Sequence, residues 1–137
     1  MEKEYLFVYG TLLSSYAKNP FKKQFSENSK FIGNAKLSAK LYDLGEYPGI
    51  IENQKGEHYV VYGEVYELLN SDFLFDLDEY ENYFPENLFQ SEYIRQKVMV
   101  SLNKDDSVLE SWTYWYKELP LKAVFIESGD YLSFLVD

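Results

Sequence analysis

The chain has 137 residues, a formal net charge of −10 and no cysteine. This length fits one domain with its own core, so we predict a single domain over residues 1–137. The negative charge argues against nucleic acid or an anionic membrane surface as a partner, and the lack of cysteine excludes disulfides and thiol chemistry. With no signal-peptide pattern and no membrane-length apolar run, we expect a cytoplasmic protein.

The first predicted strand, residues 5–9, is a compact apolar run that leads into Tyr9-Gly10-Thr11-Leu12. A strand that is apolar on both faces is typical of a buried position. Gly10 has no Cβ, so a ligand could approach the backbone closely there. The amides of Thr11 and Leu12 are then candidates to bind an anion or a developing oxyanion. The alternative is a plain tight turn, which four residues by themselves do not exclude.

The next elements follow from local patterns. Asn19-Pro20 is typical of a helix start and predicts a short helix. Residues 31–42 alternate cleanly between apolar and polar, which predicts one long strand with a polar face. Residues 45–49 are rich in chain-breakers and predict a loop. Residues 59–67 predict a further strand.

A helix is predicted to begin at Ser71-Asp72 and to run to Tyr80 or Glu81, before Pro85. Two strands follow, over residues 93–102 and 109–116, and the tail from residue 128 predicts a short helical turn. This order of elements predicts an α+β fold, a small mixed β-barrel with one or two packed helices. A plain α+β sandwich is the main structural alternative.

Glu81 occupies an unexpected position on this helix. Leu74 and Leu77 define the buried stripe, and Glu81 lies seven and four residues after them, on the same stripe. Either the helix stops early and the carboxylate meets water, or the carboxylate is held in a pocket. In a pocket, burial and the nearby charge of Asp78 would raise its pKa and suit it to act as a general base. An acidic helix end, or a carboxylate bonded to a tyrosine, is the structural alternative.

Other polar residues give weaker signals. His58 is the single histidine and is expected at the surface, so no metal site is predicted. No phosphate-binding glycine loop of either common kind is present. Arg95 either pairs with carboxylates near the end of the helix or lies exposed on the sheet. Tyr114 and Tyr116 could face a pocket, with Tyr116 taken as a candidate for substrate binding, although core packing explains each of them more simply.

Taken together, several segments resemble the gamma-glutamylcyclotransferase-like superfamily, also called avirulence-induced-gene-like proteins. The matching segments, in the order of that family, are Leu6-Phe7-Val8-Tyr9-Gly10-Thr11-Leu12, Leu41-Tyr42-Asp43-Leu44-Gly45 with Tyr47-Pro48-Gly49, Gly63-Glu64-Val65-Tyr66-Glu67, Leu77-Asp78-Glu79-Tyr80-Glu81, and Tyr93-Ile94-Arg95. Two positions depart from the family pattern. Ala39 stands where a glycine is frequent before the second segment, and Asn82 replaces the common glycine after Glu81.

The resemblance implies a barrel with a central pocket and no metal or cofactor. It also implies that Tyr9, Gly10, Thr11 and Leu12 bind the glutamyl part of a small gamma-glutamyl amine or peptide. Glu81 would be the general acid/base for attack of the substrate's own α-amine on its γ-carbonyl, which releases 5-oxoproline and a free amine. Two alternatives remain: a related enzyme that removes a gamma-glutamyl protecting group in a biosynthetic pathway, and a binding module without catalysis. The leaving amine and the oligomeric state are not predicted.

Overall fold

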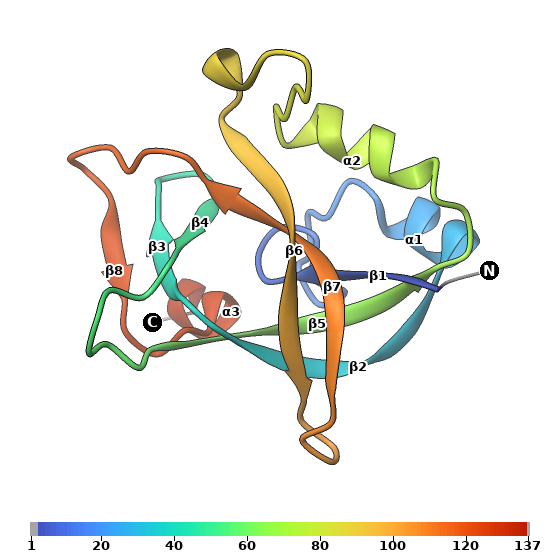
Figure 1. Ribbon diagram of the computed structural model, residues 1–137, viewed down its shortest axis with the longest axis horizontal. Coiled ribbons are helices and arrows are strands. Elements are labelled where there is room, and N and C mark those ends of the chain that lie inside the picture. Colours follow the sequence, from blue (N-terminus) through green and yellow to red (C-terminus); the bar gives the residue numbers. More distant parts are fainter. Residues whose placement is uncertain (1–2, 137) are drawn as a thin grey trace.

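The structure is a computed structural model that describes residues 3–136. Its larger sheet is a closed barrel (Figure 1), with strands in the order β1-β5-β2-β6-β7 and with β7 returning to β1. The strands are β1 (Glu4–Val8), β2 (Ser29–Ser38), β5 (Val60–Leu68), β6 (Tyr93–Leu102) and β7 (Val108–Tyr116). The β1–β7 pairing is parallel and the other pairings are antiparallel. The predicted mixed barrel is therefore confirmed.

A second sheet of three strands lies beside the barrel, in the order β4-β3-β8. Its strands are β3 (Lys40–Asp43), β4 (Pro48–Ile51) and β8 (Val124–Ile126). The helices are α1 (Lys22–Asn28), α2 (Phe73–Tyr80), the short 3-10 helix η1 (Leu88–Gln90) and α3 (Tyr131–Leu135). Rings of Phe25 and Phe73 join α1 to α2, with their centroids 5.0 Å apart. Within residues 3–136, no helix is both long and apolar enough to cross a membrane.

The prediction of one long strand over residues 31–42 is wrong, because this segment is divided between two strands, β2 and β3. The chain leaves the barrel at Ala39, whose amide donates to the carbonyl of Tyr59, and continues as β3 in the second sheet. A register shift in the β2–β5 pairing, between Phe31 and Gly33, also turns the Phe31 side chain outward, where it is 49% exposed. A bulge changes which face the following residues occupy, and the regular alternation of residue types gives no sign of it.

Two strands of the second sheet are absent from the prediction. Residues 45–49 were expected to form a loop, but β4 begins at Pro48, after a tight turn in which Leu44 donates its amide to the carbonyl of Tyr47. Proline is compatible with this place because β4 is an edge strand of its sheet. The strand β8 has only three residues and pairs with β3, so it is too short to show a periodic pattern.

The helix ends follow the predictions only in part. The side chain of Asn19 accepts the amide of Phe21 at 2.8 Å, although α1 itself begins at Lys22. Ser71 does not cap α2. Instead, Asn70 accepts the amide of Asp72 at 3.1 Å in the turn before the helix. The predicted helical turn near the carboxyl end is α3.

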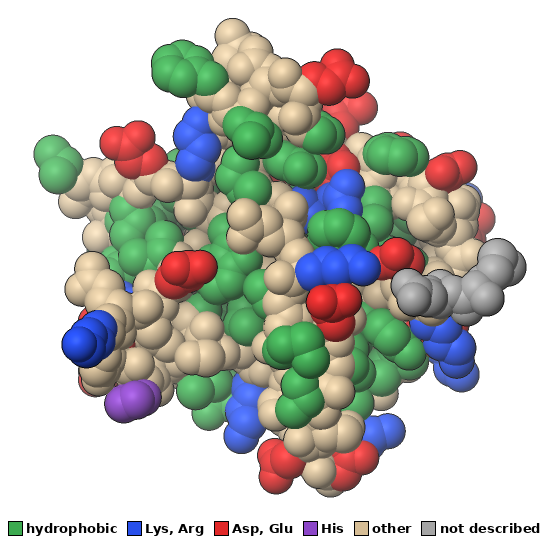
Figure 2. Space-filling view, in the orientation of Figure 1, with side chains coloured by type: hydrophobic (Ala, Val, Ile, Leu, Met, Phe, Trp, Pro, Cys, Tyr) green, Lys and Arg blue, Asp and Glu red, His purple; other side chains and the backbone are tan. Residues whose placement is uncertain are grey.

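Charged side chains of both signs are interspersed over the face of the molecule in Figure 2, without a continuous basic area on that face. His58 is exposed, as predicted from the sequence. Among residues 3–136, no group of three or more His, Asp or Glu side chains is arranged to hold a metal ion.

Candidate functional site

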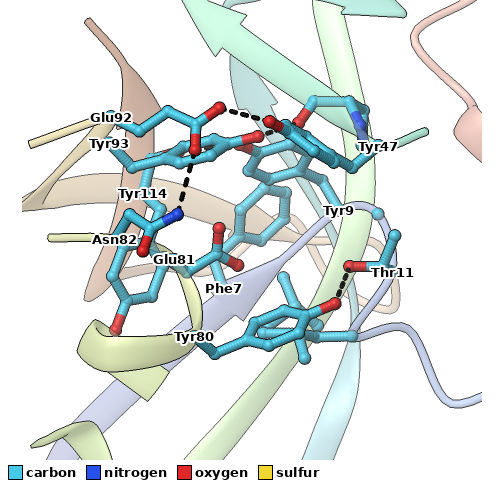
Figure 3. Close-up of a pocket in the computed structure, with 14 residues that line it drawn as sticks. Phe7, Tyr9, Thr11, Tyr47, Tyr80, Glu81, Asn82, Glu92, Tyr93 and Tyr114 are labelled. Atoms are coloured by element: carbon cyan, nitrogen blue, oxygen red, sulfur yellow. Dashed lines mark hydrogen bonds between the residues drawn. The ribbon is translucent and has the colours of Figure 1, made fainter. Parts of the chain in front are cut away.

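A cavity of about 180 Å³ lies where the end of β1, the end of α2 and the start of β6 meet (Figure 3). Its lining residues are Phe7, Val8, Tyr9, Gly10, Thr11, Leu12, Tyr47, Pro48, Tyr80, Glu81, Asn82, Glu92, Tyr93 and Tyr114. This volume is smaller than that of pockets for drug-sized ligands, so the cavity suits a small molecule. The fold thus brings together Glu81 and all four residues of the Tyr9-Gly10-Thr11-Leu12 segment.

Gly10 is required by a neighbouring side chain. A Cβ at this position would lie 2.3 Å from Cγ of Pro48, so only glycine lets the β1 loop pack against the start of β4. The sequence suggested that the missing Cβ makes room for a ligand, but the space is occupied by the Pro48 ring. The glycine therefore places the loop, and the loop in turn forms one wall of the cavity.

The loop amides remain available to a ligand. The chain turns at Gly10, whose carbonyl accepts the amide of Leu13 at 3.0 Å. Within residues 3–136, the amides of Thr11 and Leu12 donate to no protein acceptor. The hydroxyl of Tyr80 is 3.1 Å from Oγ1 of Thr11 and ties the loop to the end of α2. Unpaired backbone donors beside a cavity are suited to bind a negatively charged oxygen.

The end of α2 sets the direction of Glu81. The amide of Glu81 still donates to the carbonyl of Leu77. Glu81 therefore keeps the helical spacing from Leu77 that the sequence predicted. The helix then ends in a Schellman motif, in which the amide of Tyr83 donates to Asp78 and that of Asn82 donates to Glu79. Asn82 takes the left-handed conformation, with φ of 53°. Asparagine tolerates this conformation, which explains how it can replace glycine here.

The Glu81 carboxylate faces the cavity (Figure 3). Of the two carboxylates that line the cavity, it is the one without hydrogen-bond donors within residues 3–136. Among the described residues, no donor forms a hydrogen bond to it. Burial, together with the smaller effects of the charges of Glu92 and Asp78, raises the pKa of Glu81 from 4.5 to about 8. The residue remains partly open to solvent through the cavity. A carboxyl group with a pKa near neutrality can both accept and return a proton.

Glu92 is the second carboxylate of the cavity. Its Oε2 accepts hydrogen bonds from the hydroxyls of Tyr47 and Tyr116, the latter at 3.3 Å, and its Oε1 accepts the side-chain amide of Asn82 at 3.2 Å. The amide of Glu92 also donates to the carbonyl of Asn82 at 2.8 Å. These contacts close the base of the 82–92 loop. Sequence reasoning missed Glu92, because its position depends on this loop folding back on itself.

A buried ion pair holds the end of α2 against the barrel. Arg95 donates through Nε to Oδ1 of Asp78 at 2.7 Å and through its terminal nitrogen to Oδ2 at 3.0 Å. Tyr114 donates to the same carboxylate at 2.6 Å, and the guanidinium lies 4.4 Å from the centre of the Trp112 ring. The first of the two interpretations of Arg95, pairing with a carboxylate near the helix end, is therefore confirmed. This bidentate pair fixes the helix end from which Glu81 projects.

Tyrosines form most of the remaining wall. Tyr9 donates to the carbonyl of Tyr114 at 2.8 Å, and Tyr93 donates to the carbonyl of Pro48 at 2.6 Å. Burial raises the pKa of Tyr93 and of Tyr114 above the ordinary value, so these hydroxyls stay protonated. Tyr114 lines the cavity. Tyr116, the predicted substrate-binding residue, is not among the lining residues, and its hydroxyl donates a hydrogen bond to Glu92 at 3.3 Å.

The closed mixed barrel has the fold of a mouse AIG2-like protein of known structure. The family described as gamma-glutamyl cyclotransferase, AIG2-like, matches residues 6–133. The chain therefore belongs to this family.

Individual relatives agree with this assignment. A Vibrio cholerae protein with a provisional gamma-glutamylcyclotransferase name is 31% identical over 92% of this chain and 93% of its own length. The crystal structure of a mouse AIG2-like protein superposes with a TM-score of 0.72, at 23% identity, over 95% of this chain and 90% of that one. YkqA of Bacillus subtilis gives a TM-score of 0.70 at 24% identity over 98% of this chain. This chain spans 42% of the length of YkqA. The two structural likenesses concern the fold.

Proposed function

We propose that this protein is a gamma-glutamyl cyclotransferase, which converts a small gamma-glutamyl amine or peptide into 5-oxoproline and a free amine. The observation that carries the proposal is the Glu81 carboxylate, which has no hydrogen-bond donor, in a small cavity that is also lined by Thr11 and Leu12, whose amides are unpaired within residues 3–136. Membership of the family supports the same reaction. The proposed reaction is an intramolecular aminolysis, so it consumes no water.

The first step is the removal of a proton from the α-ammonium of the substrate, which cannot act as a nucleophile while protonated. The rise in the pKa of Glu81, from 4.5 to about 8, makes its carboxylate a stronger base and brings its pKa closer to that of an α-ammonium group. Proton transfer between groups of similar pKa requires little free energy, so Glu81 is suited to take this proton. The protonated Glu81 then supplies a proton to the departing nitrogen when the amide bond breaks.

The second requirement is to bring the amine within reach of the γ-carbonyl. An attack distance of about 3 to 3.5 Å requires the substrate to be folded back on itself. The free amides of Thr11 and Leu12 can hold either the α-carboxylate or the oxyanion that forms on the γ-carbonyl. The aromatic wall, including Tyr9 and Tyr93, restricts the space available to an extended substrate. In this proposal the cavity supplies orientation, and Glu81 supplies the proton transfers.

Product analysis tests the proposal directly. The purified protein is incubated with a panel of gamma-glutamyl amides of alkyl amines and amino acids, and the products are separated by chromatography. We expect 5-oxoproline and the free amine in equal amounts. Release of glutamate in place of 5-oxoproline would identify a hydrolase and refute the cyclisation. Tight binding of an amide without any turnover would favour the binding module.

A further inference from the structure

A second cavity lies at the side of the barrel, where α1 packs against the start of β2 and the end of β5 (Figure 1). Its volume is about 320 Å³, which is within the range of pockets that bind small organic molecules. The lining consists of three aromatic residues, three serines, one lysine and one asparagine. None of these residues lines the cavity that contains Glu81, so the two cavities are separate.

Aromatic rings form one wall of the second cavity. The ring of Tyr66 packs against that of Phe25, with centroids 4.8 Å apart, and against that of Phe31, with centroids 5.6 Å apart. The register shift after Phe31 turns this ring outward, and it is 49% exposed beside the cavity. Bulges frequently re-aim a side chain next to a binding site. A planar apolar group bound here would cover the exposed Phe31 ring, so this wall favours an aromatic ligand.

The hydroxyl groups of the second cavity already donate their hydrogens to the protein. Ser14 and Tyr66 donate to the carboxylate of Glu64, at 2.7 and 3.0 Å. Ser26 and Ser29 donate to backbone carbonyls of α1, at 2.7 and 2.6 Å. A hydroxyl oxygen that has donated its single hydrogen can still accept a hydrogen bond. These four groups therefore favour a ligand that brings an N–H or O–H donor.

The exposed charge beside the second cavity is positive. Lys22 lines the cavity and is exposed, and within residues 3–136 no carboxylate forms an ion pair with it. Residues 18–30 contain four lysines and one glutamate, in contrast to the net charge of −10 of the whole chain. Glu64 is buried, and its two oxygens are already bonded to Ser14 and Tyr66. The accessible charge thus favours an anionic group on the ligand.

We propose that the second cavity binds a small aromatic carboxylate whose ring carries an N–H or O–H donor. In this arrangement the ring lies against Phe31 and Tyr66, the ring donor bonds to a hydroxyl oxygen of the cavity, and the carboxylate pairs with Lys22. The inference involves no covalent step and does not depend on the cyclotransferase reaction. Its tests therefore measure binding alone.

Three probes of similar shape test the groups that the ligand requires. They are indole-3-propionate, its 1-methyl analogue, which lacks the ring N–H, and indole-3-propionamide, which lacks the charge. Each is titrated into the wild-type protein and followed by amide NMR spectra. We expect indole-3-propionate to bind with a Kd of about 1 mM or lower, as for an efficient ligand of its size. Loss of the ring donor should weaken binding by about 3- to 10-fold, and loss of the charge by about 2- to 5-fold.

Two variants assign the binding to the second cavity. Phe31→Ala truncates a half-exposed ring and should weaken all three probes by about 3-fold or more. Lys22→Gln should bring the Kd of indole-3-propionate close to that of the propionamide and leave the propionamide unaffected. The matched controls are Tyr62→Ala, a partly exposed ring of β5, and Lys23→Gln, the next lysine of α1, both outside the lining. Neither control should change a Kd by more than about 2-fold.

The possible outcomes are distinct. Amide shifts at Ser14, Ser29 and Tyr66, together with the expected order of the probes, would support the inference. No saturable binding of indole-3-propionate up to about 10 mM would overturn it. Amide shifts confined to the cavity of Glu81, with no effect of Phe31→Ala, would also overturn it. In the wild-type protein, equal Kd values for indole-3-propionate and its 1-methyl analogue would refute the role of the hydroxyl oxygens. Equal values for the acid and its amide would refute the role of Lys22.

Discussion

Replacing Glu81 with glutamine is expected to make the protein more stable at alkaline pH, in contrast to the usual cost of altering a buried polar side chain. The pKa of Glu81 rises from 4.5 in the unfolded chain to about 8 in the folded protein, chiefly by burial. Between these two values the folded protein keeps a proton that the unfolded chain releases. Its free energy of unfolding therefore falls as pH rises through this interval and levels off above about pH 8. Glutamine cannot titrate and escapes this loss.

The magnitude follows from the size of the pKa difference. Each pKa unit corresponds to about 1.4 kcal/mol, so the rise to about 8 sets an upper limit of about 5 kcal/mol. Glu81 is partly open to water through the cavity, and the surroundings of a carboxylate relax when it ionises. We therefore expect Glu81→Gln to gain about 2 to 3 kcal/mol relative to the wild type between about pH 4 and about pH 9.

Urea denaturation followed by tryptophan fluorescence measures this difference at each pH. The matched control is Glu79→Gln, which removes an exposed carboxylate from the same helix and should show a difference below about 0.5 kcal/mol at every pH. A stability difference for Glu81→Gln that stays constant across the pH range would refute the reasoning. So would a variant that becomes progressively less stable than the wild type as the pH rises.

Three further predictions concern the surroundings and the reaction. Gly10→Ala should destabilise the fold by about 1 to 3 kcal/mol and reduce turnover, because its Cβ would overlap the Pro48 ring; denaturation and 5-oxoproline release measure the two effects. Arg95→Ala should cost about 3 kcal/mol in a denaturation experiment, since it leaves the buried carboxylate of Asp78 without its cation. The kcat/KM profile should lose activity on its acid side below about pH 8, as Glu81 becomes protonated; a profile flat from about pH 6 to 9 would contradict its role as the base.

Matched controls are available for the first two variants. Gly33→Ala adds a methyl group 3.9 Å from the Leu102 side chain, an ordinary contact, and should leave stability and turnover nearly unchanged. Lys97→Ala removes a partly exposed cation whose closest carboxylate oxygens are 3.7 Å away, which should cost at most about 1 kcal/mol. If either control is as harmful as its partner variant, the specific contact given as the cause is wrong.

The position of Glu81 could be predicted from sequence because it depends on local geometry alone. Helical spacing from Leu74 and Leu77 places it on the buried side, and the structure retains that spacing up to the last hydrogen bond of α2. The pairing of Arg95 with Asp78 was one of two alternatives that the sequence left open for this arginine, and the structure decides between them. The mixed barrel followed from the order of strands and helices.

Features that depend on the path of the chain between elements could not be predicted in this way. Glu92 enters the cavity wall only because Asn82 and Glu92 close a loop on themselves, and no periodic pattern records that contact. The break at Ala39 and the bulge after Phe31 leave the alternation of residue types intact while changing sheet and face. The sequence placed Gly10 in the cavity loop correctly but explained the glycine by the approach of a ligand. The structure shows that the Pro48 ring takes that space, and Pro48 begins β4, a strand that was not predicted.

The central claim is that Glu81 transfers the proton that makes the substrate's own amine a nucleophile. The most direct test is single-turnover formation of 5-oxoproline by Glu81→Gln, alongside the binding of the same gamma-glutamyl amide by calorimetry. We predict binding within a few-fold of the wild type and a rate of product formation lower by about 100-fold or more. A folded Glu81→Gln protein that forms 5-oxoproline at the wild-type rate would contradict the mechanism.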